Sequence, residues 1–230
     1  TAIPRSAPSL ASKSSVNSVV VIGLGRFGAA VAGSLIRLGH DVLGIDENAE
    51  LVQSMSDHLT HVVQADTTSG DTLRRLGVHE FGCAVVGIGT DLEASVLTVL
   101  ALADLGVTEI WAKASGPKHG RILERTGAHH VVYPEAAMGE RVAHLVTGRM
   151  IDFIELDNDF AIAKTRAPRE AVGKTLGECA LRTKYGVTVV GVKRPREEFI
   201  HAGPDTKVMA DMIFIISGST RQVEAFAGTI

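Results

Sequence analysis

The stretch VVVIGLGRFGAAVAGSLIRLGHDVLGIDEN, residues 19–48, decides the fold. A run of β-branched residues leads into a Gly-x-Gly-x-x-Gly motif, a segment with helical spacing of apolar residues follows, and a second apolar run ends at Asp46. Strand, glycine-rich turn, helix, strand and acid in this order are typical of a dinucleotide-binding βαβ unit. The context therefore favours a nucleotide site over a tight turn that holds no ligand.

Each part of the motif has a physical task. Gly23 permits the tight turn, Gly25 lets a pyrophosphate approach the backbone, and Gly28 lets helix and strand pack closely. The helix N-terminus offers N–H groups and a positive dipole end to the phosphates. Asp46 can accept hydrogen bonds from the ribose hydroxyls, and its charge would repel the 2′-phosphate of NADP.

A cation inside the motif needs a separate explanation. The guanidinium of Arg26 can reach a terminal phosphate and bind it through two hydrogen bonds. The alternative is a solvated arginine at the helix start, which the helix dipole disfavours slightly. Phe27 and Glu47, next to Arg26 and Asp46 in the sequence, complete this part of the predicted nucleotide site.

Polar residues also follow the later strands that the sequence predicts. Asp66 and Thr67 stand where they could contact an adenine edge, or one of them could cap the next helix. Thr90 follows the fourth strand segment, Lys113 ends the fifth, and both are counted with the nucleotide site. Glu135 follows the sixth strand, where position alone favours an acid at a helix start over a ligand for a phosphate-bound metal.

Composition limits the function classes. The chain has 230 residues, 45% of them hydrophobic, and a formal net charge of −3, which gives no electrostatic case for binding nucleic acid. Cys83 and Cys179 lie far apart, so we expect two free thiols in the core. No apolar run reaches the roughly 20 residues that cross a bilayer, and no signal peptide is evident. We expect a soluble, cytoplasmic protein.

The alternation of short apolar runs with helical segments predicts an α/β protein with a Rossmann-type, doubly wound parallel sheet. Residues 1–16 are expected to be a flexible tail, residues 17–149 the nucleotide-binding domain, and residues 150–230 a small α+β lobe. The strands are expected at residues 17–22, 41–45, 61–65, 83–88, 109–114 and 130–134. Helices are expected from Arg26 and near residues 48–57, 70–76, 91–105, 117–127 and 135–148. In the lobe, strands are expected at 150–158, 160–168, 187–194 and 212–218, with a helix at 175–182 and another over the last ten residues.

Catalytic motifs that a nicotinamide enzyme would need are missing from the sequence. Neither Tyr133 nor Tyr185 is followed four residues later by the lysine that single-domain reductases use. No metalloprotease, hydrolase or P-loop motif occurs either. A binding module is therefore favoured, and an NAD(H)-binding redox sensor or a nicotinamide-dependent oxidoreductase remain the alternatives.

Six segments resemble the RCK (regulator of potassium conductance) family, and most of all the cytosolic gating subunits of Ktr/Trk-type bacterial potassium transporters. They are VIGLGRFG, GHDVLGID, VGIGTDLEAS, IWAKA, GAHHVVYPEAAMGERVA and RTKYGVTVVGVKR. The resemblance implies a subunit, not an enzyme, that binds ATP or ADP (NAD(H) in some relatives). It also implies a homodimer, an octameric ring of four dimers, and docking on a membrane-embedded potassium transporter at the inner face of the membrane.

The same resemblance assigns roles to single residues. It implies that Arg26 meets the phosphates, that Asp46 holds the ribose, and that Glu135 helps to bind Mg²⁺ or Na⁺ at the triphosphate. Relatives often bind cyclic di-AMP in the second lobe, and the matching positions are Leu176, Arg182 and Pro204. Exchange of ATP for ADP is then expected to change the shape of the ring and so gate the transporter.

Overall fold

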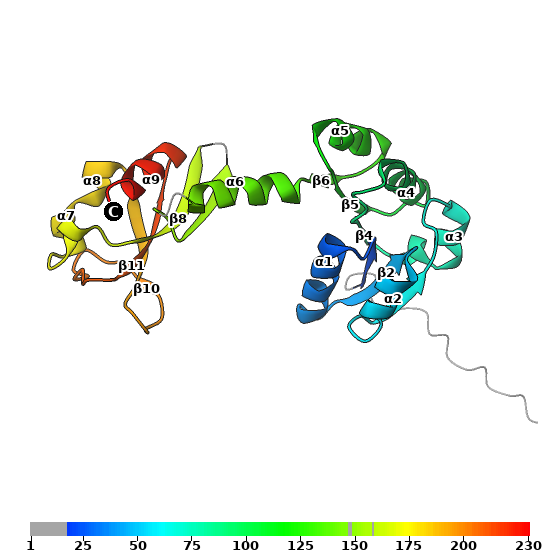
Figure 1. The fold of residues 1–230 in the computed structure, drawn as a ribbon, viewed down its shortest axis with the longest axis horizontal. Coiled ribbons are helices and arrows are strands. Elements are labelled where there is room, and N and C mark those ends of the chain that lie inside the picture. The colour runs from blue at the N-terminus through cyan, green and yellow to red at the C-terminus, as the bar shows by residue number, and fades with distance from the viewer. Residues whose placement is uncertain (1–17, 147–148, 158) are drawn as a thin grey trace, which may run out of the picture. The chain divides into compact units, whose positions relative to one another are not determined.

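The structure, a computed structural model, describes residues 18–146, 149–157 and 159–230. The predicted tail, residues 1–16, lies outside the described residues. The chain forms two compact units, one ending at Pro134 and the other running from Glu135 to Ile230 (Figure 1). Each unit has its own core and is described separately below.

The first unit is a six-stranded, wholly parallel sheet in the order β3-β2-β1-β4-β5-β6, as the sequence predicts for a doubly wound fold. From β1 the chain adds β2 and β3 on one side, and then β4, β5 and β6 on the other, so the strand order reverses between the neighbours β1 and β4. The strands are β1 (Ser18–Ile22), β2 (Asp41–Asp46), β3 (His61–Gln64), β4 (Cys83–Val86), β5 (Glu109–Lys113) and β6 (His130–Val132).

Helices cover both faces of this sheet because every second strand residue points to the opposite side. Val19 and Val21 of β1 belong to the core beneath α1 and α2, and Val20 and Ile22 to the core beneath α3, α4 and α5. The helices are α1 (Arg26–Arg37), α2 (Ala49–Met55), α3 (Gly70–Arg75), α4 (Leu92–Asp104) and α5 (Pro117–Thr126), with a 3₁₀ turn, η1, at Val78–Glu80.

The second unit is an antiparallel sheet in the order β10-β9-β11-β8-β7 with helices packed on it, which confirms the predicted α+β lobe. Its strands are β7 (Asp152–Asp157), β8 (Phe160–Arg166), β9 (Thr188–Lys193), β10 (Ile200–His201) and β11 (Ile213–Gly218). Its helices are α6 (Pro134–Val146), η2 (Arg169–Ala171), α7 (Leu176–Cys179), α8 (Leu181–Tyr185) and α9 (Thr220–Ala227). The short strand β10 was not expected from the sequence.

The helix expected at residues 175–182 is two helices instead of one. Ala180 adopts a left-handed conformation with φ 45°, which ends α7 and precedes α8. A non-glycine residue rarely takes this conformation. Nothing in the spacing of apolar residues marks such a break, so the single predicted helix was wrong at this point.

Helix α6 packs on the second unit. Its Arg141 donates two hydrogen bonds to Asp152 Oδ1, at 2.6 and 3.0 Å, and its His144 stacks on Phe153 with ring centroids 3.9 Å apart. Leu145 packs against the second core. The sequence placed this helix with the nucleotide-binding domain, up to residue 149, whereas its contacts are with β7 and α9. The compact units therefore divide at Pro134, earlier than residue 149. The limits 17–149 and 150–230 stay a prediction of where the nucleotide-binding part ends and the second lobe begins.

Candidate functional site

The glycine-rich turn joins β1 to α1 at the carboxyl edge of the sheet. Gly23 has φ 84°, a conformation that favours glycine, and its N–H donates to the carbonyl of Ile45 at 2.8 Å. A β-carbon on Gly28 would overlap the carbonyl oxygen of Gly23. The motif is therefore built as the sequence predicts, with a turn at its first glycine and close packing at its last.

The N-terminus of α1 is left open for an anion. Gly25 is its N-cap and supplies no side chain, and the first turn contains no acid. By contrast, Asn48, Ser69 and Asp91 cap α2, α3 and α4 by accepting hydrogen bonds from backbone N–H groups. Within the described chain, no side chain accepts a hydrogen bond from the first turn of α1, so its N–H groups can bind phosphate oxygens.

Asp46 closes β2 beside this turn and is only 9% exposed. Its Oδ2 accepts a hydrogen bond from Leu24 N at 2.6 Å, and its Oδ1 accepts one from Asn48 N at 2.8 Å. Each carboxylate oxygen keeps capacity for another donor, such as a ribose hydroxyl. Glu47 follows and is exposed at the same edge. The backbone thus fixes the orientation of the Asp46 carboxylate before any ligand arrives.

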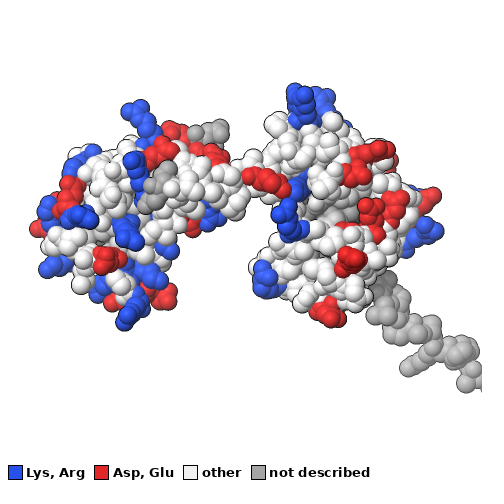
Figure 2. Space-filling model, in the orientation of Figure 1, with Lys and Arg blue, Asp and Glu red and all other residues white. Residues whose placement is uncertain are grey.

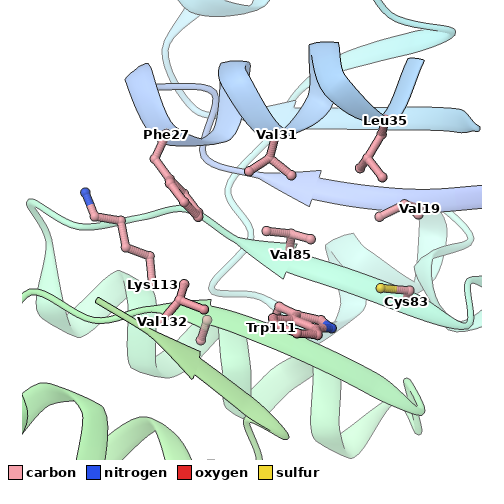
Figure 3. A pocket seen from close by; sticks show the side chains of 10 residues that line it. Val19, Phe27, Val31, Leu35, Cys83, Val85, Trp111, Lys113 and Val132 are labelled. Atoms are coloured by element: carbon pink, nitrogen blue, oxygen red, sulfur yellow. The ribbon is translucent and has the colours of Figure 1, made fainter. Parts of the chain in front are cut away.

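Arg26 and Phe27 begin α1. Arg26 is exposed, and no hydrogen bond or ion pair to it is recorded among residues 18–146, 149–157 and 159–230. The ammonium of Lys113 faces the ring of Phe27, with Nζ 5.9 Å from the ring centroid (Figure 3). Lys113 ends β5, two strands away from β1, so the sheet brings these residues of distant sequence together.

Two of the predicted site residues that follow β3 already form hydrogen bonds within the protein, and one that follows β4 is exposed. Thr67 is buried, and its hydroxyl lies 2.9 Å from that of Thr98 on α4. Asp66 is exposed, and hydrogen bonds from the hydroxyl and N–H of Thr68 hold the pKa of its carboxyl below the usual value. Ser69, and not Asp66 or Thr67, caps α3. Thr90 is exposed.

Glu135 lies in the first turn of α6 and therefore in the second unit. It is exposed and engaged with other groups. In the part of the chain that the structure describes, no three His, Cys, Asp or Glu side chains gather into a metal site. A cation here would need most of its ligands from phosphate oxygens and water, which suits Mg²⁺.

An apolar hollow of about 250 Å³, not expected from the sequence, lies between α1 and the strands β4, β5 and β6 (Figure 3). Phe27, Val31 and Leu35 reach into it from α1, and Trp111, 39% exposed, forms part of the sheet side. Cys83 also lines it, and burial raises the pKa of this thiol. The alternation of Glu109, Trp111 and Lys113 on β5 was the sequence signal for this face.

In the second unit, the structure brings two of the three predicted cyclic di-AMP residues close together. Leu176 N donates to the carbonyl of Thr206 at 3.0 Å, and Gly177 N donates to the carbonyl of Pro204 at 2.8 Å. Arg182 is exposed on α8, which follows α7 directly. Cys179, like Cys83, is a free and partly buried thiol, as expected.

The charge pattern agrees with the sequence. Both Lys and Arg side chains and Asp and Glu side chains occur on the visible surface of each unit, without a stripe of one sign (Figure 2). None of the described helices combines the length and the apolar character needed to span a bilayer.

Comparison with known proteins covers nearly the whole chain. Residues 19–134 match the TrkA-N domain family, and residues 162–229 match the TrkA-C domain family. The chain is 32% identical over 207 residues to the Ktr system potassium uptake protein A of Bacillus subtilis (strain 168), covering 90% of this chain and 93% of that protein. It is 33% identical over 207 residues to the Ktr system potassium uptake protein C of the same strain, covering 90% and 94%.

Among solved structures, the GsuK RCK domain resembles this fold with a TM-score of 0.64 and 19% identity, over 99% of this chain and 50% of that one. The GsuK channel bound to NAD resembles it with a TM-score of 0.63 and 19% identity, over 93% of this chain and 39% of that one. These likenesses confirm the predicted RCK fold of both units.

Proposed function

Because the chain belongs to the family of TrkA-N and TrkA-C domain proteins that includes the Ktr potassium uptake proteins, we propose that it is a nucleotide-responsive gating subunit of a potassium uptake system. ATP and ADP exchange in the first unit, and the exchange changes the shape of an oligomeric ring. The ring docks on a membrane-embedded potassium transporter subunit from the cytoplasmic side. The protein acts as a regulator and not as an enzyme.

The observation that carries this proposal is the open N-terminus of α1 beside the oriented carboxylate of Asp46. Free N–H donors suit the phosphates, and the carboxylate suits the ribose. Gly23, Gly25, Gly28 and Phe27 shape the turn, while Glu47, Asp66, Thr67, Thr90 and Lys113 border the adenosine and the phosphates.

Discrimination between ATP and ADP falls to Arg26. Its exposed guanidinium starts α1, and the γ-phosphate gives it a contact that ADP lacks. A ligand shifts a two-state equilibrium only by its differential affinity for the two states. One charge-assisted contact of about 1.5–3 kcal/mol, formed in one ring shape only, is enough to bias the ring.

Glu135 supplies a carboxylate to a Mg²⁺ or Na⁺ ion that the triphosphate binds. Because ADP has no γ-phosphate, this ion binds less tightly when ADP is bound. The ion therefore adds to the difference in affinity between ATP and ADP that Arg26 produces.

The assembly is a homodimer that closes into an octameric ring. A ring of dimers needs two different contact surfaces on each chain. Exposed apolar residues support this: Leu97, Leu100 and Ile122, at 39%, 42% and 49%, face outward on α4 and α5. Met138 and Val142 form a second apolar stripe on α6, and the hollow beside Trp111 is a third apolar surface. Burial in the ring would remove these surfaces from water.

A second ligand, cyclic di-AMP, binds the second unit at Leu176, Arg182 and Pro204. The hydrogen bonds that hold α7 against the segment around Pro204 support a formed surface there. A thermal shift of the second unit by cyclic di-AMP, lost in Arg182→Ala, would support this part. No shift with the native chain would remove it and leave the ATP/ADP proposal intact.

An NAD(H)-binding redox sensor is the second candidate, since one solved structure of similar fold is named as bound to NAD. The same turn and Asp46 would serve it. A nicotinamide-dependent oxidoreductase would in addition need turnover of NADH.

Calorimetric titration of the purified protein with ATP, ADP, NAD⁺ and NADH, with and without Mg²⁺, separates these candidates. We expect both adenine nucleotides to bind, with Mg²⁺ changing the ATP affinity and not the ADP affinity. Binding of NADH or NAD⁺ alone would contradict the gating proposal and favour the sensor.

Arg26→Ala tests the discrimination step. We expect ADP to bind nearly as it does to the native chain and the preference for ATP to fall about 10-fold or more, the loss of one charge-assisted contact. Arg37→Ala, at the opposite end of α1, is the matched control. Equal losses for ATP and ADP would contradict the role given to Arg26.

A further inference from the structure

The strand β4 ends against the glycine-rich turn. β4 stops at Val86, two residues earlier than the sequence suggests, and Gly87, Ile88 and Gly89 continue past the turn. Gly87 N donates to the carbonyl of Ile22 at 2.7 Å, directly before Gly23. A β-carbon on Gly23 would lie 3.0 Å from Ile88 N and 3.1 Å from the carbonyl carbon of Gly87. The two backbones are in contact there.

The contact is equally close from the other side. A β-carbon on Gly87 would lie 2.9 Å from the carbonyl oxygen of Gly23 and 3.4 Å from Gly28 N and Cα. A β-carbon on Gly28 would overlap that same oxygen. Gly28 and Gly87 therefore both pack against the carbonyl group of Gly23, and the three atoms nearest to a β-carbon on Gly87 are all backbone atoms. No side-chain rotation can relieve an added methyl group here.

We propose that Gly87, which lies outside the Gly-x-Gly-x-x-Gly motif, is a positioning residue of the nucleotide site. It lets the end of β4 support the carbonyl of Gly23 and thereby sets where the first N–H groups of α1 point. The ligand it serves is the phosphate chain of a nucleotide, while Asp46 serves the ribose from another strand. This inference rests on the proposed binding of nucleotide at the turn.

The test is Gly87→Ala, with binding of ADP and of adenosine measured separately. The methyl group must displace the Gly23 carbonyl or the end of β4, because 2.9 Å is shorter than van der Waals contact. Hydrogen bonds to phosphate weaken steeply outside about 2.7–3.2 Å. We expect ADP affinity to fall about 10- to 100-fold, the loss of one or two bonds to a charged group. Adenosine affinity is expected to change less than about 2-fold by the same reasoning.

Two other glycines provide matched controls. Gly33→Ala adds the same methyl group on α1, where its nearest neighbour is Arg37 Nη1 at 3.7 Å, and should leave both affinities unchanged. Gly127→Ala, at the end of α5, brings a β-carbon to 2.6 Å from Ala103 Cβ at a position with φ 117°, and should lower stability away from the turn. An ADP-selective loss in Gly87→Ala that Gly127→Ala does not share supports a positioning role.

The outcomes are separable. If the native chain binds ADP and Gly87→Ala binds it equally well, or loses ADP and adenosine to the same extent, the role of Gly87 is overturned while nucleotide binding stands. If the native chain binds no nucleotide, both proposals fall. If Gly87→Ala does not fold, Ile88→Ala is the second test. The side chain of Ile88 follows Gly87 and borders Gly23, where Cγ1 would lie 3.1 Å from a β-carbon built on that glycine. A selective loss of ADP there supports the proposal, and a uniform loss overturns it.

Discussion

At the scale of single residues, the site depends on backbone geometry more than on side chains. The carboxylate of Asp46 is held by two N–H groups, and the turn before α1 is shaped by glycines. Such a site is formed before the ligand binds, so little ordering entropy is lost on binding. Substitutions that add a single carbon can therefore have large effects, and their sites follow from the contacts a β-carbon would make.

Gly28→Ala is expected to lower the free energy of unfolding by about 1–3 kcal/mol or more, the usual cost of overpacking. The added carbon would overlap the carbonyl oxygen of Gly23. Gly33→Ala, five residues along the same helix, should raise stability by about 0.5–1 kcal/mol, because alanine favours helix more than glycine does. Urea unfolding of both variants measures the difference. Equal stability of the two variants would contradict the close packing at Gly28.

His119 predicts a dependence of stability on pH. It is 5% exposed, its Nδ1 accepts a hydrogen bond from Ser115 N at 3.2 Å, and its Nε2 is buried without a recorded partner among the described residues. Burial lowers the pKa of His119 below its usual value of 6.5. The folded state therefore prefers the neutral ring. The stability it contributes is complete above the unfolded pKa and declines as pH falls through 6.5 toward the folded pKa.

His119→Gln should flatten the loss of melting temperature between about pH 7 and pH 5, since one proton linkage changes stability by up to about 1.4 kcal/mol per pH unit. Exposed His58 provides the control variant, His58→Gln, which should keep the native slope. An unchanged slope in His119→Gln would show that another group carries the acid sensitivity.

At the scale of helices and strands, α6 is the element that packs in a different unit from the one predicted from the sequence. His144 stacks on Phe153 and lies 3.4 Å from Glu224 of α9. We expect His144→Ala to destabilise the second unit by about 0.5–1.5 kcal/mol, the usual value of an aromatic pair. Calorimetry of the full chain should show the shift, and Glu140→Ala, at an exposed position of the same helix, should not. Equal melting curves would mean that α6 is not anchored there.

Most elements could be predicted from the sequence because apolar spacing and turn residues determine them locally. The βαβ unit around residues 19–48 and the parallel sheet follow from such patterns. Other features could not be predicted, because they depend on distant contacts. Ala180 breaks a helix, α6 joins the second unit, and the end of β4 meets the turn at Gly87. Ser69 was also missed as the cap of α3, since Asp66 and Thr67 stand as plausibly before it.

At the scale of the whole molecule, the exposed apolar residues on α4 and α5 predict assembly. We expect the native chain to have the mass of the proposed oligomer by light scattering, and Leu100→Lys to have a smaller mass, because a charge would be buried in the contact. Leu38→Lys is the matched control, since Leu38 is 74% exposed at the end of α1. An unchanged mass for Leu100→Lys would place the contact on another face.

The position of Trp111 has a further consequence. It is the single tryptophan of the chain, it is 39% exposed beside the hollow, and its ring stacks on His130 at 4.0 Å. The tryptophan fluorescence of the unlabelled protein therefore originates from one known place. Burial of that face by a partner should shift the emission maximum toward the blue. The emission maximum measured over a dilution series would therefore report the association of the protein without a dye or a tag.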